Sequence, residues 1–228
     1  MERTGCRLMQ TNNALRAVLL DFDGTLVDSL TALKDVYFEF LSTNHVLGCD
    51  EEFELLNGPS ILEIVEAIRI KHNLEHSTQE LQQSYMSLLE KSYRDVVRPY
   101  DGAAELLSIV RDRGLSLGLV TAASRQLVDP FLSSQNWQNS FQVMVTSDDV
   151  VKAKPDPAIY LAALGKLGLP ADNVWAVEDS RNGIRAANGA GLRVIGVSSD
   201  ESVDLVASGA TLQVAGLSAV ADFIRAHR

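Results

Sequence analysis

A short apolar run that ends in two acidic residues constrains this chain more than any other feature. Val18, Leu19 and Leu20 are followed closely by Asp21 and Asp23. An apolar run of this length, closed by polar residues, is typical of a buried strand in a parallel sheet. Ligands bind at the carboxyl ends of such strands. Two carboxylates there need a cation or hydrogen-bond donors, although an acidic turn is the plainer interpretation of the pair alone.

The second half of the chain alternates helical patterns with short apolar runs. We expect helices to begin near Asp101, Arg125, Asp156, Ser180 and Ser218, and strands to lie between them at 115–121, 142–147, 174–177, 193–197 and 211–214. Strands and helices that alternate in this way form a doubly wound parallel sheet with right-handed crossovers. The predicted fold class is therefore α/β, with a Rossmann-like sheet.

Residues 29–97 follow a different pattern, because every periodic segment in them is helical. Ser29 can cap a first helix, residues 43–50 read as a loop, and two capping boxes begin at Ser60 and Ser77. The pair Arg98-Pro99 ends the pattern. We therefore predict an α/β core domain formed by residues 1–28 and 98–228, with an inserted helical cap domain at 29–97.

Composition excludes some partners and leaves others open. The 228 residues carry a formal net charge of −10, which argues against nucleic acid or an anionic membrane as the main partner. No apolar run is long enough to span a bilayer, and Met1 to Leu15 reads as a loose leader without the apolar core of a signal peptide. Cys6 and Cys49 have no ligand spacing and are expected to be reduced thiols. We expect a cytoplasmic monomer or homodimer.

Three further polar groups follow predicted strands. Thr121 comes after 117–120, Lys154 comes shortly after the strand near Val143, and Glu178-Asp179 comes after 174–177. Each alone is more often structural, as a cap, a solvated lysine or a turn. The same edge of the sheet would nevertheless gather all of them around one crevice.

This set resembles the four motifs of the haloacid dehalogenase superfamily, in order and over nearly the whole chain beyond Leu15. The string from Asp21 to Ser29, Asp-Phe-Asp-Gly-Thr-Leu-Val-Asp-Ser, resembles the first motif, DxDGTLxDS. Lys154 is favoured over Lys152 because Pro-x-Pro follows it, as in the family. The helical segment looks like the small cap of phosphoglycolate phosphatase and β-phosphoglucomutase-like members.

The resemblance implies a role for each residue. Asp21 would be the nucleophile and Asp23 the acid/base, while Thr121 and Lys154 would hold the phosphoryl group. Magnesium would be held by Asp21, Asp23 (through its carbonyl), Glu178 and Asp179. Substrate contacts are expected from Thr121, Ala122 and Lys154 in the core and from Asn57, Gly58 and Ser60 in the cap.

The chemistry of phosphate esters explains the same residue types. A carboxylate can attack phosphorus and form an aspartyl-phosphate, but it repels a phosphate dianion unless a divalent cation bridges them. Magnesium prefers hard oxygen ligands. The expected function is a magnesium-dependent phosphatase acting on a small phosphorylated metabolite of the phosphoglycolate or sugar-phosphate type.

Other functions stay open at this point. A β-phosphoglucomutase-like phosphotransferase is the nearest, although Ile61 stands where its cap loop would carry an arginine. Asp23 argues against a dehalogenase and against a phosphonate hydrolase. A non-catalytic binding module of the same fold is a further alternative. The string His72-Asn-Leu-Glu75-His76 matches the inverted zinc-protease pattern, but that chemistry needs both histidines on one helix.

Overall fold

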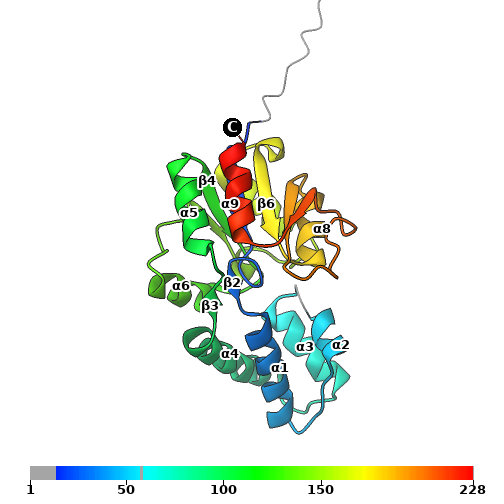
Figure 1. Cartoon of the computed structure of the whole chain (residues 1–228). Helices are drawn as coiled ribbons and strands as arrows, with labels where there is room; N and C mark the ends of the chain where they lie inside the picture. The colour runs from blue at the N-terminus through cyan, green and yellow to red at the C-terminus, as the bar shows by residue number, and fades with distance from the viewer. Residues whose placement is uncertain (1–13, 57–58, 228) are drawn as a thin grey trace, which may run out of the picture.

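The computed structural model describes residues 14–56 and 59–227. Its centre is a six-stranded sheet in the order β5-β4-β1-β6-β7-β8, in which every neighbouring pair is parallel (Figure 1). The strands are β1 (Ala17–Leu20), β4 (Ser116–Val120), β5 (Val143–Val145), β6 (Val174–Glu178), β7 (Arg193–Val197) and β8 (Leu212–Val214). The predicted α/β class with a doubly wound parallel sheet is confirmed.

The register of the central strands explains why their polar ends meet. β1 pairs with β4 on one side and β6 on the other, so that Leu20 lies level with Leu119 and Val177. The next residue, Asp21, therefore stands level with the ends of both neighbouring strands, and its amide donates to the Val177 carbonyl over 3.0 Å. One edge of the sheet thus receives side chains from three adjacent strands.

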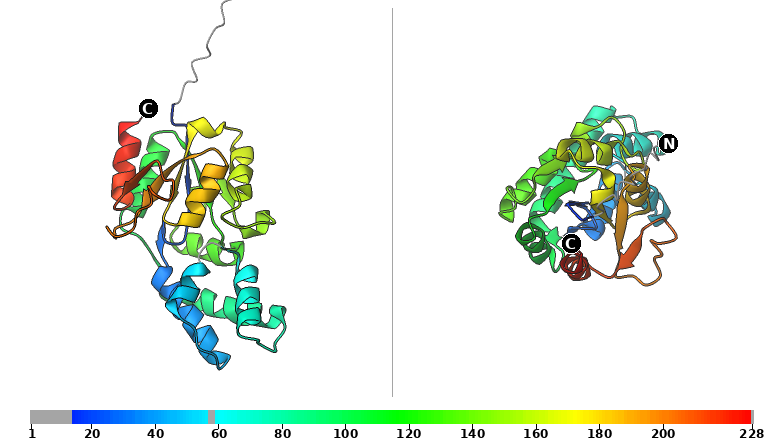
Figure 2. Two further views of the ribbon diagram at one scale, coloured as in Figure 1. Left: turned by 90° about the vertical axis from the view of Figure 1, so that its right-hand side faces the viewer. Right: turned by 90° about the horizontal axis from the view of Figure 1, so that it is seen from above.

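Alternating side chains of the sheet feed two apolar layers. Val18 and Leu20 join the layer with α5 (Ala103–Asp112), α6 (Arg125–Ser134) and α9 (Leu217–Ala226). Ala17 and Leu19 join the opposite layer with α7 (Ala158–Leu167) and α8 (Arg181–Gly189). Figure 2 shows helices on both sides of the sheet. Both faces of β1 are consequently buried, which is why its sequence is continuously apolar.

Four helices lie at the end of the molecule below the sheet in Figure 1. They are α1 (Leu30–Thr43), α2 (Asp50–Leu55), α3 (Ile61–Lys71) and α4 (Thr78–Asp95). The chain enters and leaves this helical segment through β2 (Val27–Asp28) and β3 (Arg98–Pro99), which pair antiparallel as a two-stranded ribbon. The helical segment, residues 29–97, is therefore connected to the sheet through two adjacent strands.

The local signals in the helical segment had mixed outcomes. Both capping boxes are present, at Ser60–Glu63 and Ser77–Glu80. Ser29 occupies the N-cap of α1, but its side chain makes no capping bond. The short helix α2 was not assigned from the sequence, since its six residues are too few for a clear period.

Two predicted helix starts in the sheet region were wrong by one or two residues. The helix α5 begins at Ala103 with Gly102 at its N-cap, so Asp101 does not cap it. Gly102 has a φ of 85°, in the left-handed region that glycine enters without strain. The pair Asp156-Pro157 predicts an N-cap followed by the first helical residue, but Pro157 is itself the N-cap of α7, and the Asp156 carboxylate accepts a bond from the Ala158 amide over 3.0 Å.

The zinc interpretation of the histidine string is wrong. α3 ends at Lys71 and α4 begins at Thr78, with Asn73 at a φ of 51° between them, so no continuous helix holds both histidines. His72 instead contacts the Glu52 carboxylate, with Nε2 3.0 Å from Oε1. Within residues 14–56 and 59–227 we find no helix whose length and apolar character would let it cross a membrane.

Candidate active site

The carboxyl edge of the sheet gathers the polar residues that the sequence singled out. Asp21, Thr121 and Asp179 follow the ends of β1, β4 and β6, and Glu178 is the last residue of β6. Lys154 arrives from the loop between β5 and α7. Asp21, Asp23, Thr121, Ala122, Lys154 and Asp179 line a single cavity between this edge and the helical segment.

Lys154 is the centre of the charge arrangement. Its ammonium Nζ lies 2.5 Å from Asp21 Oδ1 and 2.6 Å from Glu178 Oε1, and 3.3 Å from the Val120 carbonyl oxygen. Burial alone would lower the pKa of Lys154, but the carboxylates of Asp21 and Glu178 outweigh it and raise that pKa. The lysine therefore stays charged. Lys152, the competing lysine, is exposed and pairs with Asp156 over 3.7 Å.

Glu178 lies behind Lys154 and is fully buried. Its Oε1 accepts a bond from the Tyr160 hydroxyl over 2.6 Å. Burial and the negative charge of Asp21 raise the pKa of Glu178 to about 7, against the opposing effects of Lys154 and Tyr160. A Cβ on Gly183 would lie 1.9 Å from Glu178 Oε2, so only glycine lets α8 approach this carboxylate so closely.

Asp21, Glu178 and Asp179 form a cluster of carboxylates that fits a divalent cation. One oxygen of each lies within 4.8 Å of the other two. Burial, followed by the charges of Asp21 and Glu178, raises the pKa of Asp179 well above its ordinary value. Thr25 Oγ1 donates to Asp179 Oδ1 over 3.2 Å. Because one lysine cannot neutralise three clustered acids, two of them buried, this site suits a hard cation such as Mg²⁺.

The side chain of Asp23 lies outside that cluster and meets the helical segment instead. The Tyr93 hydroxyl of α4 donates to Asp23 Oδ1. Burial raises the pKa of Asp23 to about 6, although the bond from Tyr93 lowers it. Tyr93 also stacks on Phe22, with ring centroids 6.2 Å apart. Sequence reasoning missed Tyr93, because its position in α4 indicates only a core-facing residue.

Thr121 is buried and is already oriented by the backbone. Its Oγ1 accepts a bond from the Ala123 amide over 3.0 Å, which leaves the hydroxyl hydrogen free to donate. Ala122 lies beside it in the cavity wall. The arrangement gives an anion at this edge an ammonium and a hydroxyl as donors.

Of the three predicted substrate contacts of the cap, the structure describes only Ser60. Ser60 Oγ donates to Glu63 Oε2 over 2.8 Å within the capping box. Ser60 lines a neighbouring cavity, which it shares with Ala122. Asn57 and Gly58 lie outside the described residues. The contact of these three residues with a substrate remains a prediction.

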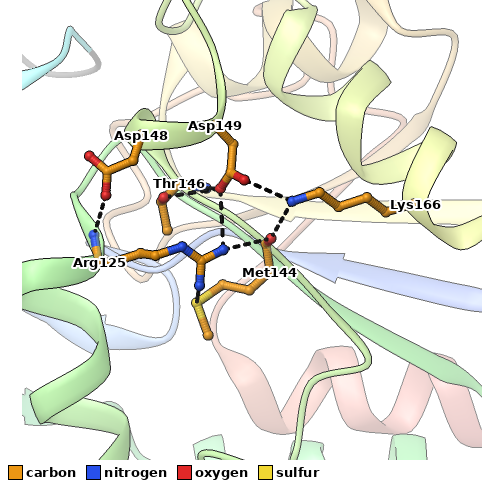
Figure 3. A network of polar contacts seen from close by, with 6 residues as sticks. All are labelled: Arg125, Met144, Thr146, Asp148, Asp149 and Lys166. Atoms are coloured by element: carbon orange, nitrogen blue, oxygen red, sulfur yellow. Dashed lines mark hydrogen bonds and ion pairs between the residues drawn. The ribbon is translucent and has the colours of Figure 1, made fainter.

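A polar network braces the start of the loop that carries Lys154 (Figure 3). Asp149, at the end of a single turn of 3₁₀ helix (Ser147–Asp149), accepts from Lys166 of α7 over 2.9 Å and from the Thr146 amide over 2.9 Å. Arg125 Nη2 of α6 lies 3.3 Å from the same carboxylate. Sequence reasoning missed this network, because its members lie far apart in the chain.

Comparison with known proteins agrees with this geometry. The family model described as haloacid dehalogenase-like hydrolase matches residues 18–197. A phosphoglycolate phosphatase of Yersinia pestis is 34% identical over 191 residues, which cover 81% of this chain and 81% of that protein. A phosphorylated carbohydrates phosphatase of Thermotoga maritima is 28% identical over 194 residues, covering 80% and 85% respectively.

Solved structures share the whole architecture. CbbY from Rhodobacter sphaeroides in complex with phosphate superposes with a TM-score of 0.77 at 24% identity, covering 90% of this chain and 95% of that one. A β-phosphoglucomutase from Clostridium difficile gives a TM-score of 0.77 at 22% identity, covering 93% and 96%. At such identities the likeness concerns the fold alone. The family match, the Yersinia relative and the ordered motifs together show that this chain belongs to the haloacid dehalogenase-like hydrolase family.

Proposed function

We propose that this enzyme is a magnesium-dependent phosphatase that hydrolyses a small phosphorylated metabolite through an aspartyl-phosphate on Asp21. The observation that carries the proposal is the position of Asp21. Its carboxylate stands at the end of the central strand, 2.5 Å from the Lys154 ammonium and beside Asp179 in the acidic cluster. A family of hydrolases with phosphatase-named relatives supports the same reaction.

The residues around Asp21 would have separate roles in the formation and in the hydrolysis of the aspartyl-phosphate. A carboxylate oxygen of Asp21 attacks phosphorus while the bond to the ester oxygen breaks, and Asp23 gives a proton to the leaving oxygen. Asp23 then takes a proton from a water that attacks phosphorus and releases Asp21. Lys154 and Thr121 would donate to the phosphoryl oxygens throughout.

The carboxylates of Asp21 and Asp179, with the Asp23 carbonyl, would hold Mg²⁺, and Glu178 would support them from behind Lys154. The ion supplies positive charge that offsets the repulsion between a carboxylate and a phosphate dianion. Asp23 fits the role of acid/base, because its raised pKa of about 6 lets it carry a proton near neutral pH.

The helical segment would act as a cap on this site. Tyr93 of α4 contacts Asp23, and the two connecting strands β2 and β3 lie side by side, as a shared hinge would. We retain the division into a core at 1–28 and 98–228 and a cap at 29–97 as part of this proposal. A cytoplasmic location belongs to it as well.

The test is phosphate release from p-nitrophenyl phosphate, followed by detection of the intermediate. With millimolar Mg²⁺, acid quenching during turnover should leave a phosphoryl group on the peptide that contains Asp21, seen by mass spectrometry. A folded protein that released no phosphate from any ester would contradict the proposal. A mutase would instead return a phosphorylated sugar isomer without net phosphate release, and a binding module would neither turn over nor become labelled.

A further inference from the structure

The cavity at the candidate active site has two walls of opposite character. The core wall carries the charged and polar groups that would hold a phosphate, including Asp21, Thr121 and Lys154. The insert wall, which the helical segment supplies, is formed by hydrocarbon and aromatic side chains, among them Leu33, Phe53, Leu56, Ile64, Tyr85 and Leu89. Among the described lining residues, none on the insert wall carries a charge.

Each lysine and arginine side chain of the helical segment either forms an ion pair away from the cavity or is exposed. Lys34 pairs with Asp50 over 2.8 Å, Lys71 with Glu52 over 3.0 Å and Arg69 with Glu66 over 2.7 Å. The two remaining cations of residues 29–97, Lys91 and Arg94, are exposed on α4, and Arg94 lies 3.2 Å from Asp95. None of these five side chains lines the cavity.

Among the described residues of the insert wall, the side-chain polar atoms are the hydroxyls of Tyr85 and Tyr93. The Tyr93 hydroxyl already donates to Asp23. Burial raises the pKa of Tyr85, so that its hydroxyl stays neutral. Against the described part of this wall, a second anionic group on the substrate would therefore face hydrocarbon without a counter-charge, and sugar hydroxyls would lose water and gain few partners.

The apolar side chains of this wall are not simply filling a core. Leu33, Phe53, Leu56 and Ile64 are only partly buried, and each packs with one side against the main apolar cluster. Their other surface faces the same cavity as Asp21. An apolar ligand group that covered this surface would gain the free energy of removing it from water.

We propose that the alcohol part of the substrate is an uncharged alkyl or aryl group, seated against the insert wall while its phosphate meets Asp21 and Lys154. The inference rests on the proposed phosphatase function and narrows it. It sets aside the phosphoglycolate and sugar-phosphate types, whose carboxylate or hydroxyls would need polar partners on that wall.

The first test is a series of alkyl phosphates that differ only in chain length. Propyl, butyl, pentyl and hexyl phosphate have leaving groups of nearly equal basicity, so differences in kcat/KM report contact with the wall. We expect kcat/KM to rise about four-fold per methylene until the wall is covered. 2-Phosphoglycolate and glucose 6-phosphate should be at least about ten-fold poorer than hexyl phosphate.

The second test places a charge on the wall. Ile64→Arg should lower kcat/KM for hexyl phosphate at least about ten-fold and raise it for 2-phosphoglycolate. Ile70→Arg is the matched control, because Ile70 lies on the same helix, is 66% exposed and does not line the cavity. It should leave both values unchanged. Ile64→Thr, which removes apolar surface without adding a charge, serves if the arginine variant does not fold.

The two hypotheses fail in different ways. A wild-type preference for 2-phosphoglycolate or glucose 6-phosphate, or a hexyl phosphate rate unaffected by a folded Ile64 variant, would overturn the apolar substrate and leave the phosphatase intact. Absence of phosphate release from every ester would overturn the proposed function, and this inference with it.

Discussion

The two walls of the cavity differ in what constrains them. The core wall holds Asp21 and Asp179 directly after paired strands, where their spacing is fixed by the register of the sheet, and it receives Lys154 from the loop between β5 and α7. The described part of the insert wall is built mostly from apolar and aromatic side chains that come from separate helices. Chemistry at phosphorus dictates residue types and distances, whereas recognition of the alcohol part requires only a surface of the right polarity.

Substitutions on the two walls should therefore have different effects on the enzyme kinetics. A substitution on the core wall should reduce turnover of every ester by a similar factor. A substitution on the insert wall should change the ranking of esters and leave the chemical step in place. Four measurements test that separation, beginning with the one whose effect should be largest.

Asp21→Asn should abolish turnover of every ester alike, by about 10⁴-fold or more, because an amide cannot serve as the nucleophile. The variant should still melt cooperatively, since Lys154 keeps its contact with Glu178 at 2.6 Å. Initial rates on p-nitrophenyl phosphate and hexyl phosphate, with a thermal melt, check this. A folded variant with near-normal rates would show that Asp21 is not the nucleophile.

Magnesium should affect both turnover and stability. We expect EDTA to lower turnover at least about 100-fold, because an ion of this kind contributes several kcal/mol of charge stabilisation. Millimolar Mg²⁺ should also raise Tm, since it binds the folded carboxylate cluster; at 100 times Kd the gain is about 2.7 kcal/mol.

Asp179→Asn is the matched control for the metal. In EDTA it should melt no lower than the wild type, because it removes one of three mutually repelling acids, and its Tm should respond little to Mg²⁺. Differential scanning calorimetry with and without the ion distinguishes these cases. Equal Mg²⁺ responses in both proteins would place the ion elsewhere.

Tyr93→Phe tests the hydrogen bond from α4 to the proposed acid/base Asp23. The change keeps the ring stacked on Phe22 and removes only the hydroxyl that donates to Asp23. We expect kcat/KM to fall about ten-fold for hexyl phosphate, because Asp23 would no longer be held in position to protonate the alkoxide, and to change little for p-nitrophenyl phosphate, whose leaving group needs no proton. A uniform loss on both esters would assign Tyr93 a purely structural role.

Sequence reasoning succeeded where a single local rule decides the outcome. The strand that precedes Asp21, the edge on which Thr121 and Glu178 fall, and the capping box at Ser60 each follow from a few neighbouring residues. The family resemblance assigned roles to the same positions. Strand ends in a parallel sheet are therefore readable without a structure.

The sequence could not supply what depends on distant segments. Tyr93 is 70 positions from Asp23, and nothing in the period of α4 distinguishes it from Tyr85 as a core residue. The apolar insert wall combines residues of several helices. The sequence does not tell which lysine and arginine side chains point away from the cavity, so the lack of charge in the described part of this wall could not be predicted. The start of α5 at Ala103 rather than Asp101 depended on the left-handed Gly102.

The smallest expected effect lies outside both walls, at the network that braces the Lys154 loop. Burial disfavours the charge of Asp149, but Lys166 and Thr146 lower its pKa to about 2, below the ordinary value of 3.8. Because the pKa of Asp149 is lower in the folded state than in the unfolded state, its charge stabilises the protein at pH values above the unfolded-state pKa. That stability is lost as the pH falls from about 4 towards 2.

Asp149→Asn should therefore lower the free energy of unfolding at pH 7 by about 1 kcal/mol, a value reduced for partial solvent screening. The deficit should shrink as the pH falls from about 4 towards 2, because the Asp149 carboxylate of the wild type takes up a proton over that range. Urea unfolding of both proteins across that range measures it, with Asp148→Asn as the neighbouring control. Since Asp149 touches neither wall, the ranking of esters should stay unchanged. A deficit that did not depend on pH would mean that the carboxylate acts through its shape and not its charge.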